Sequence, residues 1–164
     1  MRTRLTGLAA TALLTLTACG ATEAAPAATA GPAAEHLTVT DAWVKAAPDG
    51  MTAAFGTVTN TGESAVTVVS VESDAATDLE LHETVEGETG EMVMQEVEGF
   101  TLEPGGVLEL APGGDHIMLI GLTGPIRAGD TVDLTLVLDD GSRLALTAPG
   151  KDFAGANESY HEDR

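Results

Sequence analysis

Three kinds of residue are scarce in this 164-residue sequence: cysteine, aromatic side chains and basic side chains. There is one cysteine, one tryptophan, one tyrosine and three phenylalanines, and seven lysines and arginines stand against 26 aspartates and glutamates. A lone cysteine excludes an intramolecular disulfide, so a stable fold requires a hydrophobic core. A formal net charge of −19 repels nucleic acid and anionic lipid headgroups, which argues against proteins that bind them through basic surfaces.

The N-terminal segment has the layout of a secretory signal. Arg2 and Arg4 precede an apolar run that ends in small residues and the single cysteine, Cys19. The run is shorter than the roughly 20 apolar residues that a membrane span requires. The sequence LTAC at 16–19 resembles a bacterial lipobox, in which the cysteine is lipidated and becomes the first mature residue. We therefore expect a lipoprotein signal peptide over 1–18 and an exported protein, anchored at the extracytoplasmic face of the membrane or in the periplasm.

The remaining sequence divides into a tether, a domain and a tail. Residues 19–35, rich in alanine and proline, have the composition of a flexible tether behind the lipidated cysteine. Residues 36–150 are long enough for one compact domain. Residues 151–164 form a polar C-terminal tail that we expect to be loosely held. Removal of the signal leaves five basic residues against 26 acidic ones, a formal charge of about −21.

The central domain is predicted to be all-β. Its short apolar and polar alternations are separated by turn residues, and almost no segment has the 3.6-residue period of an amphipathic helix. Val132, Leu134, Leu136 and Leu138 share one parity, and Asp140-Gly141 then turns the chain into SRLALTA, which predicts a hairpin. About eight strands at such spacing favour a β-sandwich or a Greek-key barrel.

Two histidines and two methionines occur at positions that could share a site. In GDHIMLIGL, His116 and Met118 are two apart and so lie on the same face of a strand. In LELHETV, His82 points away from the face that carries the leucines. Met94, in GEMVMQEV, shares its face with Met92. The alternative interpretation is that the methionines fill gaps in a core beside a hydrogen-bonded histidine.

The chemistry of this set favours one metal. Two thioethers and two imidazoles are soft, neutral ligands, which suit Cu(I) and discriminate against Mg²⁺, Ca²⁺ and Mn²⁺. A blue-copper electron-transfer site requires a cysteine thiolate, and zinc sites normally use cysteine, histidine or carboxylate. The interpretation that remains is a protein that carries copper without redox catalysis. We therefore do not expect an enzyme.

The chain resembles the periplasmic copper chaperones called PCu(A)C, also described as DUF461-type copper chaperone lipoproteins. Their signature is His, ten residues, Met, 21 residues, His, one residue, Met. Here 21 residues separate Met94 from His116 and one separates His116 from Met118, while eleven separate His82 from Met94. The extra residue is assigned to the EGETG turn, because loops tolerate insertions. The 21-residue spacing favours Met94 over Met92 as the ligand.

The resemblance also covers DAWVKAAPDGMTAAFGTVTNTG, LEPGGVLELAPGGDHIMLIGL and GDTVDLTLVLDDGS, nearly the whole domain. It implies a cupredoxin-like Greek-key β-barrel or sandwich that binds Cu(I) through His82, Met94, His116 and Met118. It further implies delivery of copper to the dinuclear copper site of cytochrome c oxidase, with its subunit II or another copper chaperone as partner and a membrane contact through the lipid anchor only. Cu(II) at a secondary site is a further expectation. His36, Met51 and His161 could each supply a second, weaker copper site, although terminal histidines and a methionine in a turn more often have no ligand role.

Two other functions are considered. A noncatalytic, lipid-anchored β-sandwich for adhesion or sensing would explain the tether and the acidic surface, but the two histidines and two methionines would then coincide by chance. A hydrolase or oxidase lacks support, because no Ser-His-Asp spacing stands out and the carboxylates are typical of a solvated surface. Asp139-Asp140 is interpreted as a turn and not as a calcium site.

Overall fold

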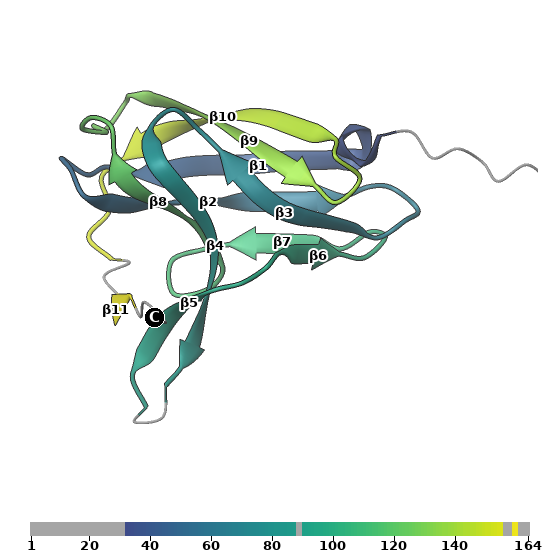
Figure 1. The fold of residues 1–164 in the computed structure, drawn as a ribbon, viewed down its shortest axis with the longest axis horizontal. Helices are drawn as coiled ribbons and strands as arrows, with labels where there is room; N and C mark the ends of the chain where they lie inside the picture. Colours follow the sequence, from purple (N-terminus) through teal and green to yellow (C-terminus); the bar gives the residue numbers. More distant parts are fainter. Residues whose placement is uncertain (1–31, 88–89, 156–158, 161–164) are drawn as a thin grey trace, which may run out of the picture.

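The chain folds into two packed layers of β-strands (Figure 1). The structure is a computed structural model and describes residues 32–87, 90–155 and 159–160. In chain order, the described elements are the 3-10 helix η1 (Ala33–His36) and the strands β1 (Leu37–Lys45), β2 (Met51–Asn60), β3 (Val66–Glu72), β4 (Ala76–Glu86), β5 (Met92–Glu96), β6 (Phe100–Leu102), β7 (Val107–Leu110), β8 (His116–Leu122), β9 (Thr131–Leu138), β10 (Arg143–Lys151) and β11 (Ser159–Tyr160). The prediction of an all-β domain is confirmed, with more strands than the sequence indicated.

The strands follow the order β11-β5-β4-β8-β2-β1-β10-β9-β3-β6, and β7 pairs with β2. The first layer contains β1, β2, β4, β5, β7, β8 and β11, and the second contains β3, β6, β9 and β10. A short parallel pairing between β1 and β10 joins the two layers. The hairpin of β4 and β5 extends beyond the body of the molecule in Figure 1.

The main hydrophobic core lies between these layers. Alternate residues of β9, namely Val132, Leu134, Leu136 and Leu138, are all buried, and Leu119 of β8 joins them with 0% of its surface exposed. Burial of one face of β9 follows from the period-2 alternation of the sequence. The opposite, outer face of the first-layer strands does not take part in this core.

The predicted hairpin near the C-terminus is confirmed. Strands β9 and β10 pair antiparallel along their length, and the chain reverses at Asp140 and Gly141. Gly141 has φ of +80°, a left-handed conformation that glycine adopts without steric cost. The leucines of β10, Leu144 and Leu146, are only partly buried, because they pack at the margin of the main core.

An irregularity in β1 changes which of its residues face outward. The register of β1 against β2 shifts between Thr40 and Trp43, and Asp41 within this stretch has φ of +54°. This β-bulge brings the strands so close that a Cβ added at Gly56 would lie 3.0 Å from the Cα of Ala42. Beyond the bulge, Trp43 pairs with a phenylalanine of β2 on the outer face of the first layer.

Both ends of the domain are attached to it. The backbone N–H of Ala33 donates to a carboxylate oxygen of Asp140 at 2.8 Å, so ordered contacts begin before the first strand. At the other end, the ring of Phe153 packs edge-on against Trp43 with centroids 5.3 Å apart, and β11 pairs in parallel with β5. Within the described residues, Phe153 and β11 of the C-terminal segment therefore have packing and pairing partners in the domain.

Several predicted features fall outside the described residues. These are the signal peptide 1–18, the lipidation site Cys19, most of the tether and His161. Within the ranges that the structure describes, no helix is both long and apolar enough to cross a membrane.

Candidate metal centre

Three neighbouring strands of the first layer bring the predicted ligands onto one face. Strand β4 pairs with β8 so that His82 lies opposite His116, and with β5 so that Thr84 lies opposite Met94. Residues directly opposed in antiparallel strands share a face, as do residues two apart in one strand. His82, Met94, His116 and Met118 consequently share the outer face of the first layer.

The intervening residues of the same strands face the main core. Leu81 of β4 and Ile117 of β8 are each 4% exposed and belong to that core. The alternation in LELHETV therefore separates a leucine that stabilises the fold from a histidine on the other face. The four candidate ligands are not members of the main core.

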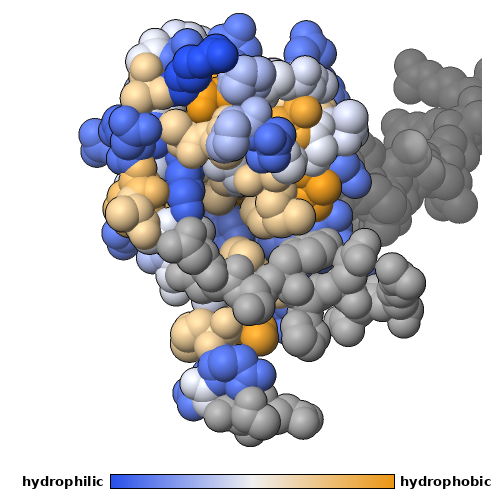
Figure 2. All heavy atoms as spheres, turned by 90° about the vertical axis from the view of Figure 1, so that its left-hand side faces the viewer, coloured by the Kyte–Doolittle hydropathy of each residue, from blue (hydrophilic) through white to orange (hydrophobic). Residues whose placement is uncertain are grey.

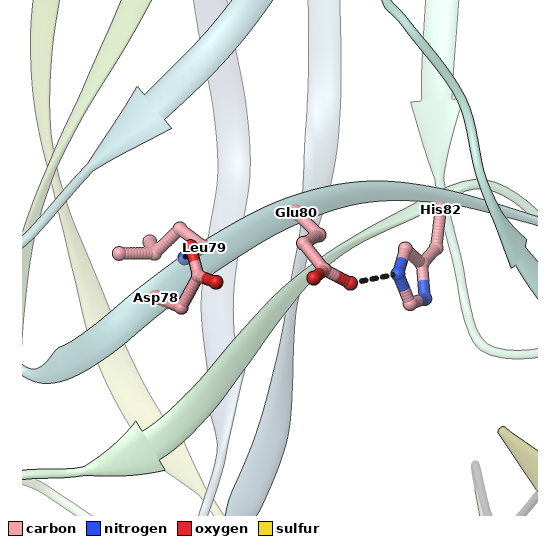
Figure 3. A network of polar contacts seen from close by, with 4 residues as sticks. All are labelled: Asp78, Leu79, Glu80 and His82. Atoms are coloured by element: carbon pink, nitrogen blue, oxygen red, sulfur yellow. Dashed lines mark hydrogen bonds and ion pairs between the residues drawn. The ribbon is translucent and has the colours of Figure 1, made fainter. Parts of the chain in front are cut away.

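The two histidines form a buried pair. Their ring centroids lie 5.4 Å apart with an interplanar angle of 75°, and His82 and His116 are 0% and 3% exposed. Each ring is held by a hydrogen bond on one nitrogen. Nε2 of His82 lies 2.7 Å from Oε2 of Glu80, and Nδ1 of His116 lies 2.9 Å from the carbonyl oxygen of Gly114 (Figure 3 shows the first of these contacts).

These hydrogen bonds determine which nitrogen would bind a metal. A carboxylate and a carbonyl oxygen both accept, so each bonded ring nitrogen carries the proton. The lone pair then lies on Nδ1 of His82 and on Nε2 of His116. Metal-binding histidines commonly donate their second ring N–H to a carboxylate or a backbone carbonyl, which is the arrangement seen at both rings.

The two candidate methionines are buried in a second, smaller hydrophobic cluster on this outer face. Met94 is 7% exposed and Met118 is 4% exposed, and they cluster with Ala53 and Phe55. Met92, on the same face of β5, is 47% exposed. Burial thus separates the two methionines that sequence parity could not distinguish, and it favours Met94.

A row of aromatic rings leads to the histidines. Trp43 and Phe55 have centroids 4.6 Å apart, and Phe55 lies 6.3 Å from His116. On the far side of the row, Phe153 contacts Trp43, and the ammonium of Lys151 lies 5.6 Å from the centre of the Trp43 ring. Phe55 is the ring of this row that contacts the histidine pair.

Sequence reasoning missed Glu80, Trp43 and Phe55 as parts of this site. Glu80 could have been found, because it is two residues from His82 and so shares its face. The aromatic residues could not, because Trp43 depends on the β-bulge where β1 pairs with β2, and Phe55 depends on the pairing of β2 with β8.

Two of the three candidates for a secondary site, Met51 and His36, lie far apart, and the third, His161, is outside the described residues. Met51 is at the start of β2 and is 47% exposed. His36 is near the other end of this strand, where its carbonyl oxygen accepts a hydrogen bond from the backbone N–H of Thr61 at 2.8 Å. A strand of this length separates them by about 30 Å, at about 3.3 Å per residue.

Acidic residues border the histidine pair. Burial raises the pKa of Asp115, the negative charge of Glu83 raises it further, and the positive charge of His116 lowers it.

Viewed from the left of Figure 1, the surface mixes apolar and hydrophilic residues instead of presenting one continuous apolar face (Figure 2). In the parts of the chain that the structure describes, no three residues among histidine, cysteine, aspartate and glutamate are grouped so that they could hold a metal ion. The two buried methionines, Met94 and Met118, share the outer face with the two imidazoles.

The domain matches a known family and several solved structures. A family model described as "Putative lipoprotein LpqE-like" matches residues 37–150. "Putative lipoprotein Lxx21020" from Leifsonia xyli subsp. xyli (strain CTCB07) is 49% identical over 148 residues, which cover 90% of this chain and 89% of that protein. The copper-bound PCuAC domain of PmoF2 has a TM-score of 0.60 at 17% identity, over 72% of this chain and 94% of that domain, which establishes likeness of fold alone.

A second solved protein is closer in sequence. The solution structure of apo-DR1885 from Deinococcus radiodurans has a TM-score of 0.58 at 33% identity, over 88% of this chain and 98% of that one. The Cu(I) form of DR1885 has a TM-score of 0.56 at 32% identity, over 73% and 82%. The predicted cupredoxin-like β-sandwich of the PCuAC type is therefore confirmed as the fold. Because the family model spans most of the chain, this protein belongs to the LpqE-like lipoprotein family.

Proposed function

We propose that this protein is an extracytoplasmic copper chaperone that binds Cu(I) through His82, Met94, His116 and Met118. One observation carries the proposal: two buried imidazoles, each hydrogen-bonded on one nitrogen, share a sheet face with two buried thioethers. The existence of a Cu(I) form of DR1885, a relative at 32% identity, supports the same metal and oxidation state.

The chemistry of the donors suits transport. Thioethers and neutral imidazoles are soft ligands that prefer Cu(I) over the hard cations, and they leave the ion with its single positive charge. Residues 36–150 contain no cysteine, so the ligands are thioethers and imidazoles without a thiolate. A carrier requires ligands that can release the ion to an acceptor. No redox change of the metal is required, in keeping with a binding protein and not an enzyme.

The cellular role follows from the N-terminus and from the family. Relatives named as lipoproteins support export and a lipid anchor at Cys19. A tethered carrier at the outer side of the membrane could reach the dinuclear copper site in subunit II of cytochrome c oxidase, or a second copper chaperone. The acidic surface disfavours nucleic acid as a partner and restricts membrane contact to the lipid. A secondary Cu(II) site is also part of the proposal, but His36 and Met51 are too far apart to form it together.

Anaerobic titration of the domain with Cu(I) against a competing chelator tests the proposal. We expect one tightly bound ion and an X-ray absorption spectrum with both sulfur and nitrogen scattering. His116→Ala should weaken binding, and the double variant of Met94→Leu and Met118→Leu should weaken it further and reduce the sulfur scattering. Undiminished binding by the double variant would refute the His/Met site, and absence of binding by the unaltered domain would favour the adhesion or sensing alternative.

A further inference from the structure

Glu80 lies directly against one of the two histidines. It is two residues before His82 on β4, so both side chains are on the outer face, and its carboxylate oxygen Oε2 is 2.7 Å from Nε2 of His82. The Glu80 side chain is 17% exposed and that of His82 is 0% exposed, so the contact is largely removed from water. Figure 3 shows the carboxylate and the ring meeting along the strand.

We propose that Glu80 is a positioning residue for Cu(I) at His82, an inference that rests on the proposed copper site. Its carboxylate accepts the Nε2–H hydrogen bond, which selects one tautomer of the neutral ring and places the lone pair on Nδ1. It also fixes the rotation of the ring about its bond to Cβ. The ring is thus oriented before the ion arrives, so less rotational freedom of the side chain is lost on binding.

The carboxylate also supplies charge that the ligands lack. Two thioethers and two neutral imidazoles leave the positive charge of Cu(I) uncompensated in a buried place, which is unfavourable. The other histidine, His116, donates to the backbone carbonyl of Gly114, a neutral acceptor. Glu80 places a negative charge one hydrogen bond away from the ligand ring, and the polarised imidazole becomes a better donor to the metal.

The sheet provides a matched control for this charge. Glu96 on β5 is directly opposite His82 and shares its face, but it is exposed to solvent. Glu96→Gln and Glu80→Gln change the net charge equally, near the same histidine. Because solvent screens the exposed carboxylate, Glu96→Gln should have little effect on copper.

Three variants separate orientation from charge. Glu80→Leu removes both the acceptor and the charge, and we expect Cu(I) affinity to fall about 10-fold to 100-fold, the usual range for loss of such a partner. Glu80→Gln retains a carbonyl acceptor of nearly the same shape but no charge, and its affinity should lie between those of Glu80→Leu and the unaltered protein. Glu96→Gln should remain within about twofold of the unaltered protein, since exposed charges interact weakly.

The tautomer of His82 is measured separately, by nitrogen-15 NMR of the copper-free protein. We expect the Nε2–H form in the unaltered protein and in Glu80→Gln, and a mixture of tautomers in Glu80→Leu. Unchanged affinity and an unchanged tautomer in Glu80→Leu, with normal copper binding by the unaltered protein, would overturn this inference alone. Failure of the unaltered protein to bind copper would overturn the proposed function as well. If Glu80→Leu does not fold, comparison of Glu80→Gln with Glu96→Gln still decides the role of the charge.

Discussion

The two methionines of β5 offer a sharp test of the copper site, because they differ in burial and in little else. Met94 is 7% exposed and Met92 is 47% exposed, and both are on the same face of one short strand. Replacement of either by leucine nearly conserves volume and apolar character. We therefore expect Met94→Leu to change the free energy of unfolding by less than about 1.5 kcal/mol, and Met92→Leu by less than about 0.5 kcal/mol.

Copper affinity should separate the two variants, because ligation requires a thioether and packing does not. Leucine has no lone pair, so Met94→Leu removes one of the two thioether ligands, and we expect at least a tenfold loss of Cu(I) affinity, or about 1.4 kcal/mol. Met92→Leu should leave the affinity within about twofold, since its thioether is directed toward solvent. Anaerobic competition titrations measure the affinities, and urea denaturation of the copper-free proteins measures the stabilities.

Two results would refute this reasoning. Equal affinities for the two variants would mean that burial does not identify the ligand on β5. A larger loss in Met92→Leu would mean that Met92 is the ligand and that Met94 fills a gap in the outer cluster. Both measurements are made on the same samples, so that a loss of affinity caused by unfolding is distinguished from the loss of a ligand.

Three further predictions concern the fold and the anchor. Leu119→Ala should lower the free energy of unfolding by about 2–5 kcal/mol in urea denaturation, because this fully buried side chain lies in the main core. Hydrogen bonds from Ala33 and Ser142 lower the pKa of Asp140, so its stabilising contribution is present at neutral pH and is lost as the pH falls through that lowered pKa. Asp140→Asn should therefore reduce the acid sensitivity of the urea midpoint below about pH 4, the ordinary range of an aspartate; an unchanged acid profile would contradict this. Cys19→Ser should move the protein from the membrane fraction to the soluble fraction, and a mature N-terminus elsewhere, found by mass spectrometry, would show that Cys19 is not lipidated.

Sequence periodicity was sufficient for the parts of the fold that depend on local alternation. The buried face of β9, the turn at Asp140 and the hairpin with β10 all follow from a period of two and a turn dipeptide. The shared face of His116 and Met118 follows from the same rule. These features require no knowledge of which strands are neighbours.

Other features depend on contacts between distant segments and could not be predicted. Met92 and Met94 have the same parity. The 21-residue spacing to His116 favours Met94 as the ligand, but the burial of Met94 and the exposure of Met92 depend on how β5 packs against its neighbours. Trp43 reaches the outer face because β1 bulges where it pairs with β2. The contact between Phe153 and Trp43 likewise joins segments that are distant in the sequence, so the composition of the tail gave no sign of it.

The placement of Trp43 has a spectroscopic consequence. It is the single tryptophan of the chain, and it is located on the outer face, in contact with Phe55 and Phe153. Its fluorescence therefore reports the outer cluster and the attached C-terminal segment, whereas far-ultraviolet circular dichroism reports the strands of both layers. If the outer face unfolds before the main core, the fluorescence curve will show its transition at a lower urea concentration than the circular dichroism curve. The natural tryptophan is then a probe of local unfolding that requires no added label.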